Sequence, residues 1–98
     1  MAYEISWTDV AIEDYRRVID YLLDNWSQSV ADNFEKIVNN KLSTLARQPF
    51  LGMPSVKSPS VRSIPLTKHN QLFYRIEMTH IEVLAIFDTR QDPSKKPF

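Results

Sequence analysis

The first half of the chain shows two different hydrophobic periods. Residues 2–7 alternate between apolar and polar side chains, which predicts a short strand. Within residues 9–26 and 31–45, apolar side chains recur every three or four positions, which predicts two amphipathic helices. Their apolar stripes are Ala11, Tyr15, Val18, Ile19, Leu22 and Trp26, followed by Ala31, Phe34, Ile37, Val38, Leu42 and Leu45. The short connection between them predicts an antiparallel helical hairpin.

Polar residues mark the ends of these helices. Thr8 or Asp9 can cap the first helix, because their side-chain oxygens accept hydrogen bonds from the N–H groups of a first helical turn. Ser29 fits a capping pattern for the second helix, and Ser27 is its rival. The second helix should end just before Pro49, since proline disfavours helix at the residue that precedes it.

The second half of the chain predicts three strands. Residues 61–67 and 70–78 alternate between apolar and polar side chains, whereas residues 81–87 are apolar almost throughout, as in a central strand covered on both faces. Pro65 has no N–H to donate to a neighbouring strand. The first of these strands should therefore lie at a sheet edge or be bulged at that position.

The remaining segments are expected to be irregular. Residues 49–60 contain three Pro and the only Gly of the chain, which predicts an irregular loop. In that loop we expect Gly52 to adopt a backbone conformation that other residues avoid. Residues 88–98 are expected to form a polar tail. The whole chain, residues 1–98, is then a single α+β domain of order β-α-α-β-β-β, with the helical hairpin packed on a small, mainly antiparallel sheet.

Composition excludes several classes of protein. Without Cys there is no disulfide framework or thiolate zinc site, and two His make a structural metal site improbable, so we expect no metal and no cofactor. No apolar run approaches the roughly 20 residues of a spanning helix, and no signal peptide is visible, so we expect a cytoplasmic protein without membrane contact. We also expect Trp7 and Trp26 to be buried in the core.

Charge is unevenly distributed although the net charge is +0. Residues 1–35 hold eight acidic and two basic side chains, whereas residues 36–76 hold seven basic and no acidic side chains. This asymmetry is compatible with an interaction surface or with an acidic helix and a basic loop that balance each other. A neutral total therefore does not exclude a local cationic site.

The basic side chains of the predicted sheet are the main candidates for chemistry. The candidates are Arg62, Arg75, Arg90, His69, Lys57 and Lys68. Guanidinium groups bind phosphate bidentately, so several around one sheet face could hold an RNA backbone. Alternatively, Arg62 and Arg75 pair with Glu77, Glu82 or Asp88 in a structural network across the strands.

An ordered set of motifs runs along the chain. They are W-T-x-x-A-x-x-D-Y from Trp7, N-W-S with A-x-x-F from Asn25, L-x-x-x-P-x-x-G from Leu45, V-R at Val61, and F-Y-R-I followed by I-x-V-L-x-I-F-D-T-R-Q-D-P from Phe73. This set resembles the RelE/ParE superfamily of toxins from bacterial toxin–antitoxin operons, with a closer likeness to its ParE-like plasmid-stabilisation branch.

The resemblance implies a growth-inhibiting toxin in a heteromeric complex with a cognate antitoxin. ParE-like members poison DNA gyrase, whereas RelE-like members cut mRNA on the ribosome and often use a C-terminal His or Tyr. After Ile86 this chain has neither residue, so the resemblance favours a gyrase inhibitor without enzymatic activity. An endoribonuclease and an inactive, antitoxin-binding member are the alternatives. The residues carried over as partner-binding are Arg62, Tyr74, Arg75 and Arg90.

Overall fold

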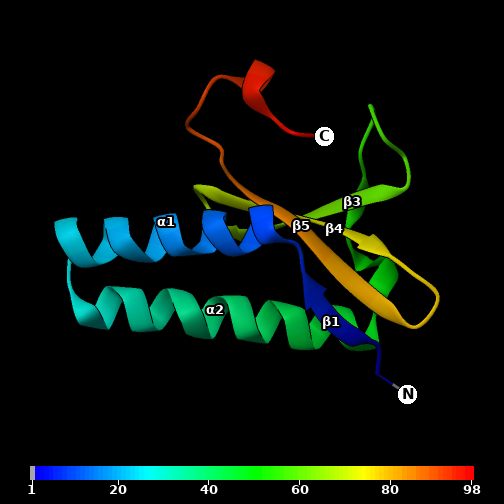
Figure 1. Ribbon diagram of the computed structural model, residues 1–98, viewed down its shortest axis with the longest axis horizontal. Coiled ribbons are helices and arrows are strands. Elements are labelled where there is room, and N and C mark those ends of the chain that lie inside the picture. The colour runs from blue at the N-terminus through cyan, green and yellow to red at the C-terminus, as the bar shows by residue number, and fades with distance from the viewer. Residues whose placement is uncertain (1) are drawn as a thin grey trace.

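The computed structural model describes residues 2–98 and has the expected α+β architecture. Figure 1 shows the two helices side by side beneath one face of a sheet, with the C-terminal segment over the other face. The elements are β1 (Glu4–Trp7), α1 (Asp9–Asn25), α2 (Gln28–Arg47), the 3-10 helix η1 (Pro49–Leu51), β2 (Met53–Pro54), β3 (Val61–Thr67), β4 (Asn70–Ile76), β5 (His80–Asp88) and the 3-10 helix η2 (Pro93–Lys95).

Side-chain caps define where the helices begin. The Thr8 hydroxyl oxygen accepts a hydrogen bond from the Ala11 N–H at 3.1 Å and donates to the Leu84 carbonyl, which fixes α1 to β5. Ser27 caps α2 by accepting from the Val30 N–H at 3.2 Å. The preference for Ser29 was therefore wrong, because α1 ends at Asn25 and only two residues separate the helices. The predicted end of α2 before Pro49 is confirmed.

The sheet has five strands in the order β1-β5-β4-β3-β2. β1 runs parallel to β5, and the other pairs are antiparallel. The expectation that residues 49–60 are wholly irregular was wrong, since η1 and the two-residue edge strand β2 lie within them. The pairing of β3 with β4 shifts between Pro65 and Thr67, which confirms the predicted bulge.

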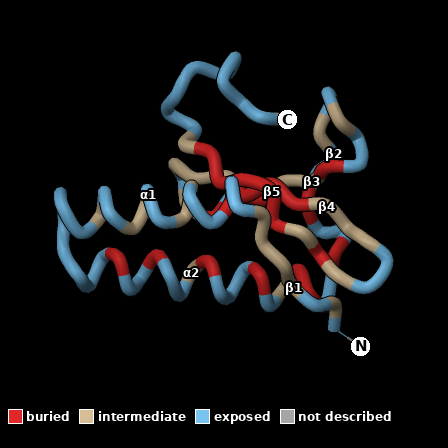
Figure 2. The backbone as a smooth tube through the Cα atoms, viewed as in Figure 1, coloured by how far each residue is buried: buried red, intermediate tan, exposed pale blue. Residues whose placement is uncertain are grey.

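Figure 2 shows that β5 is buried along most of its length. Apolar side chains cover both of its faces. Ile81, Val83 and Ile86 belong to the core between the helices and the sheet. Leu84, Ala85 and Phe87 belong to a second cluster on the other face, which also contains Val61 and Phe73, with Phe98 packed against it. The predicted central strand is confirmed, and the tail, expected to be polar, places one aromatic ring on the sheet.

The two tryptophans differ in burial. Trp7 packs against the core with its ring centroid 5.5 Å from that of Tyr15, as expected. Trp26 is 68% exposed, so the expectation that both are buried was wrong. The reason is its position at the residue that ends α1, on a hairpin tip that extends past the sheet (Figure 1). None of the helices in residues 2–98 is long and apolar enough to cross a membrane.

Candidate functional site

The strand arginines do not share one face of the sheet. Arg62 lies opposite Tyr74 in the register, and Tyr74 belongs to the core beneath the helices. Arg75 is the next residue on β4 and therefore points to the other face, opposite Glu82 of β5. Of the two alternatives that the sequence left open, a single cationic face does not fit this pair, because the pleat and the strand register separate the two guanidinium groups.

Arg62 holds the turn that follows α2. Its Nη1 donates hydrogen bonds to the carbonyls of Phe50, at 3.3 Å, and Gly52, at 2.7 Å. Its guanidinium carbon also lies 5.0 Å from the centroid of the Phe50 ring, a cation–π geometry. The predicted pairing of Arg62 with an acidic side chain is absent from residues 2–98, where carbonyl oxygens and an aromatic face take that place.

Tyr74 holds the same turn from inside the core. Its side chain is fully buried, and its hydroxyl donates to the Pro49 carbonyl at 2.7 Å and accepts from the Gly52 N–H at 2.9 Å. Burial raises the pKa of this phenol above its ordinary value. A side chain in this position offers no surface to a partner, so the expectation that Tyr74 contacts one does not fit the structure.

Gly52 is required here by space, not by an unusual backbone conformation. Its φ of −73° and ψ of 156° are open to any residue, so the predicted special conformation was wrong. A Cβ atom on Gly52 would lie 2.5 Å from the Tyr74 hydroxyl oxygen and 2.9 Å from the Ser63 carbonyl oxygen. The tyrosine can therefore reach the turn only because residue 52 has no side chain.

Carboxylates neutralise Arg75 and Arg90, of which the second lies in the turn after β5. Arg75 pairs with Glu77 at 2.9 Å and with Glu82 at 3.0 Å, and hydrogen bonds to these two carboxylates raise the pKa of its guanidinium. This is the structural network that the sequence left open. Arg90 pairs with Asp88 at 2.8 Å, and hydrogen bonds from Arg90 lower the pKa of that carboxyl.

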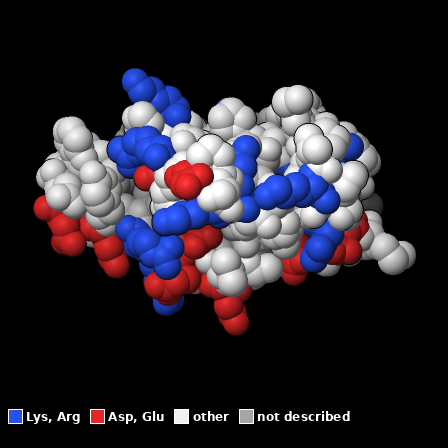
Figure 3. All heavy atoms as spheres, turned by 90° about the horizontal axis from the view of Figure 1, so that it is seen from above, with Lys and Arg blue, Asp and Glu red and all other residues white. Residues whose placement is uncertain are grey.

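The other basic candidates are distributed along the molecule. Lys57 lies in the loop before β3, and Lys68 and His69 form the turn between β3 and β4. Lys and Arg side chains form a band over the face seen in Figure 3, while most Asp and Glu side chains in that view lie along its lower margin. His69 and Arg90 both line a groove at the end of the sheet near the hairpin tip, and Lys68 precedes His69 in the β3–β4 turn.

A groove of about 590 Å³ opens at that end of the molecule. Its apolar wall comes from α1, the hairpin tip and α2, and its polar rim comes from the β3–β4 turn and the end of β5. The lining residues are Asp14, Arg17, Val18, Tyr21, Leu22, Trp26, Val30, Asn33, Phe34, Ile37, Thr67, His69, Asn70, Ile86, Asp88, Arg90 and Gln91. Such a groove, apolar inside and polar at its rim, suits an amphipathic segment of another chain.

Ion pairs and backbone contacts order the rim of the groove. Asp14 accepts a hydrogen bond from the Ile86 N–H at 3.0 Å and pairs with Arg17 at 3.3 Å, so it connects α1 to β5. The Arg90–Asp88 pair lies on the same rim. Charged side chains therefore frame the apolar wall that contains Trp26.

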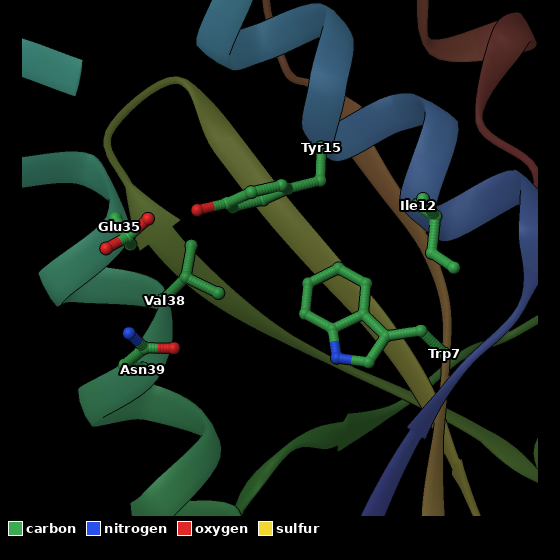
Figure 4. Close-up of a pocket in the computed structure, with 6 residues that line it drawn as sticks. All are labelled: Trp7, Ile12, Tyr15, Glu35, Val38 and Asn39. Carbon is green, nitrogen blue, oxygen red and sulfur yellow. The ribbon is translucent and has the colours of Figure 1, made fainter. Parts of the chain in front are cut away.

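A second, smaller hollow of about 380 Å³ lies between α1 and α2 (Figure 4). Trp7 and Tyr15 meet edge to face in it, and the Tyr15 hydroxyl points towards Glu35. Burial, and secondarily the charge of Glu35, raise the pKa of Tyr15. Val38 at the wall is buried in the core, so this hollow is a shallow gap between the helices and not an enclosed site.

A groove beside the helices that could receive a helix of the antitoxin follows from the sequence, but its lining residues were not identified, because Trp26 was expected to lie in the core. Trp26 was counted in the core stripe of the first helix, and Tyr21 and Val30 lie off both stripes. Large apolar side chains off the stripe, close to the hairpin turn, were the available signal for a partner surface.

Family comparison agrees with this architecture. The family model described as "ParE toxin of type II toxin-antitoxin system, parDE" matches residues 5–93. The chain belongs to the ParE toxin family. The chromosomal ParDE toxin–antitoxin system from P. aeruginosa contains a similar chain, with a TM-score of 0.74 and 18% identity over 89% of this chain and 96% of that one.

More distant toxins share the fold of this ParE family member. The YoeB dimer from Staphylococcus aureus has a TM-score of 0.62 and 23% identity, over 87% of this chain and 94% of that chain. The RelBE2 toxin–antitoxin complex from Mycobacterium tuberculosis contains a chain with a TM-score of 0.64 and 18% identity, over 90% of this chain and 99% of that chain. The RelE/ParE-like fold is thereby established, whereas a search among curated protein sequences found no match.

Proposed function

We propose that this type II toxin arrests growth by poisoning DNA gyrase in the cytoplasm, and that a cognate antitoxin neutralises it. Membership of the ParE family supports the first part of the proposal. One observation in the fold carries it further: the strand arginines are apart from one another and already have partners.

A ribonuclease of this size needs several cations and an acid or base around one phosphate. Here Arg62 and Arg75 lie on opposite faces of the sheet. Arg75 and Arg90 pair with residues six positions apart on β5, Glu82 and Asp88, which separates those carboxylates by about 20 Å. His69 lines the groove with Arg90 and follows Lys68 in the β3–β4 turn, away from Arg62 and Arg75. The side chains of a phosphate-cleaving site are thus present but not assembled, which supports inhibition by binding.

The test is induction of the toxin without its antitoxin, read out for DNA and for mRNA together. We expect a DNA-damage response with filamentation, and accumulation of cleaved DNA when purified toxin is mixed with gyrase. Cuts within the codons of mRNA, in cells whose DNA remains intact, would establish the endoribonuclease instead. Unaffected growth would leave only an antitoxin-binding role.

The antitoxin part of the proposal rests on the groove at the hairpin tip. Structures described as a RelBE2 toxin–antitoxin complex and a YoeB–YefM complex share the fold. The groove offers an apolar wall about as long as two helical turns, from Phe34 to Trp26 through Val30, with charged groups at its rim. An amphipathic helix of the antitoxin fits this arrangement, because its apolar face can cover Trp26 while its polar face meets the ion pairs.

A further inference from the structure

Four large apolar side chains stand exposed at the end of the molecule opposite the hairpin tip. Phe50 and Leu51 of η1 are 67% and 54% exposed, Met53 of β2 is 75% exposed, and Val56 of the following loop is 99% exposed. We call these four residues the apolar platform. Small soluble domains rarely collect so many exposed apolar side chains in seven consecutive positions without a partner for them.

The part of the apolar platform that lies in η1 is held from beneath. The Tyr74 hydroxyl bonds to both ends of η1, at Pro49 and Gly52, and Arg62 donates to the carbonyls of Phe50 and Gly52. The guanidinium also lies against the Phe50 ring. A surface that is already ordered before binding loses less conformational freedom in the complex, which favours tight and specific association.

The chain on both sides of the apolar platform is basic. Arg47 in the last turn of α2 and Lys57 beside Val56 are both exposed and border it in the sequence. Residues 36–76, which contain the whole of the apolar platform, include no acidic side chain. Its natural complement is an apolar pocket whose rim carries Asp or Glu side chains.

Shape separates the apolar platform from the groove. Figure 1 shows the segment after β2 extending outward beyond the sheet, at the end opposite the hairpin tip. The 20 residues of α2 place the two surfaces about 30 Å apart. A groove receives a segment of a flexible chain, whereas a protruding, pinned surface enters a pocket of a folded one.

We propose that the apolar platform is the surface by which this toxin binds its protein target, and that the matching surface of the target is apolar and rimmed by acidic side chains. Arg62 and Tyr74 act as positioning residues beneath it. The inference rests on the proposed function only in requiring that the toxin act on a protein.

The test compares two exposed apolar positions during antitoxin-free induction. Val56→Asp places a charge in the apolar platform, and Met78→Ser, at a residue 95% exposed in the β4–β5 turn, is the matched control. We expect Val56→Asp and Phe50→Ser to lose growth arrest and to weaken target binding about 30-fold, the effect of removing an interface hot spot. Met78→Ser should remain as toxic as the unchanged chain, and all three should retain the folded spectrum and antitoxin capture.

A second pair tests the charge. Lys57→Glu should weaken target binding and flatten its salt dependence, whereas Lys41→Glu, at an exposed position of α2, should not. Full toxicity of Val56→Asp overturns the inference, and so does loss of antitoxin capture together with toxicity, which would assign the apolar platform to the antitoxin. If toxicity depends on the apolar platform but gyrase is unaffected, the gyrase proposal alone is overturned. If the chain without substitutions causes no growth arrest, both proposals are overturned.

Discussion

The two ends of α2 present apolar side chains in opposite ways. At its start, Trp26 and Val30 line a groove framed by charged side chains. After its end, Phe50 is exposed in a turn that the buried Tyr74 holds in place, and Met53 and Val56 are exposed in the segment that follows. The comparison teaches that a chain of 98 residues can separate a surface for a flexible segment from a surface for a folded partner.

The energetics of the two ends also differ. The turn beneath the apolar platform depends on hydrogen bonds of the buried Tyr74, which are costly to leave unmade. The groove rim depends on ion pairs such as Arg90–Asp88, which are partly exposed and stabilise little. Substitutions beneath the apolar platform should therefore lower stability, whereas substitutions at the groove should chiefly change binding.

The largest effect is expected for Gly52→Ala. The added methyl group would meet the Tyr74 hydroxyl oxygen at 2.5 Å and the Ser63 carbonyl oxygen at 2.9 Å, so the turn or the tyrosine must move. We expect the free energy of unfolding in urea to fall by about 3 kcal/mol, the upper range for overpacking. A change below about 0.5 kcal/mol would show that the turn adjusts freely and that the apolar platform is not pinned.

Tyr74→Phe should follow, with a loss of about 2 kcal/mol in the free energy of unfolding. The substitution keeps the ring but leaves the Gly52 N–H and the Pro49 carbonyl without their partner in a buried position. Tyr21→Phe, at an exposed tyrosine of the groove, is the matched control and should change stability by less than about 0.5 kcal/mol. Equal losses for the two variants would remove the distinction between the ends.

Trp26→Ser should leave the fold intact and weaken the antitoxin complex at least about tenfold, roughly 1.4 kcal/mol. The indole is the largest exposed apolar group of the groove wall and makes little contribution to the core. Calorimetric titration with the antitoxin measures the effect, and Val56→Ser serves as the control at the other end. Antitoxin affinity that falls for Val56→Ser and not for Trp26→Ser would reverse the assignment of the two surfaces.

Arg75→Met tests whether Arg75 stabilises the fold through its ion pairs or binds a nucleic acid. The guanidinium pairs with Glu77 and Glu82 on the open face, at half-exposed positions, so its loss should cost less than about 1 kcal/mol of stability. Growth arrest should persist, because neither the groove nor the apolar platform contains Arg75. Abolished toxicity in a stable variant would return this residue to a binding role.

The smallest effect is expected for the pH dependence of stability that comes from the Arg90–Asp88 pair at the groove rim. Arg90 holds the pKa of Asp88 below its ordinary value of 3.8, so the stabilising pair is complete above that value and is lost as pH falls through the lowered pKa. We expect Asp88→Asn to remove this part of the acid dependence of unfolding, by less than about 1 kcal/mol. An unchanged acid profile would mean that the pair contributes nothing measurable.

The elements were predictable because each depends on nearby residues. The helical stripes, the stop before Pro49, the bulge at Pro65 and the doubly covered β5 all follow from local periods and from the chemistry of proline. The candidate site was harder, since the faces of Arg62 and Arg75 depend on how strands pair, and the register is a property of the assembled sheet.

Two predictions were wrong because local sequence does not show which distant residues will lie nearby in the fold. Gly52 was assigned a special backbone conformation, whereas its true constraint is a tyrosine 22 positions away. Trp26 continues the apolar stripe of the first helix, but the sheet ends before it, so the stripe has nothing to cover there. In both cases the deciding neighbour comes from a distant part of the chain.

The pairing of β1 with β5 has a consequence for synthesis. Within residues 2–98, β1 has hydrogen-bonded strand neighbours only in β5, and the cap of α1 bonds to Leu84, 76 positions after Thr8. The first strand and the first helix therefore reach their final positions only after residues 80–88 have left the ribosome. The fold is therefore complete only after the last strand has been made.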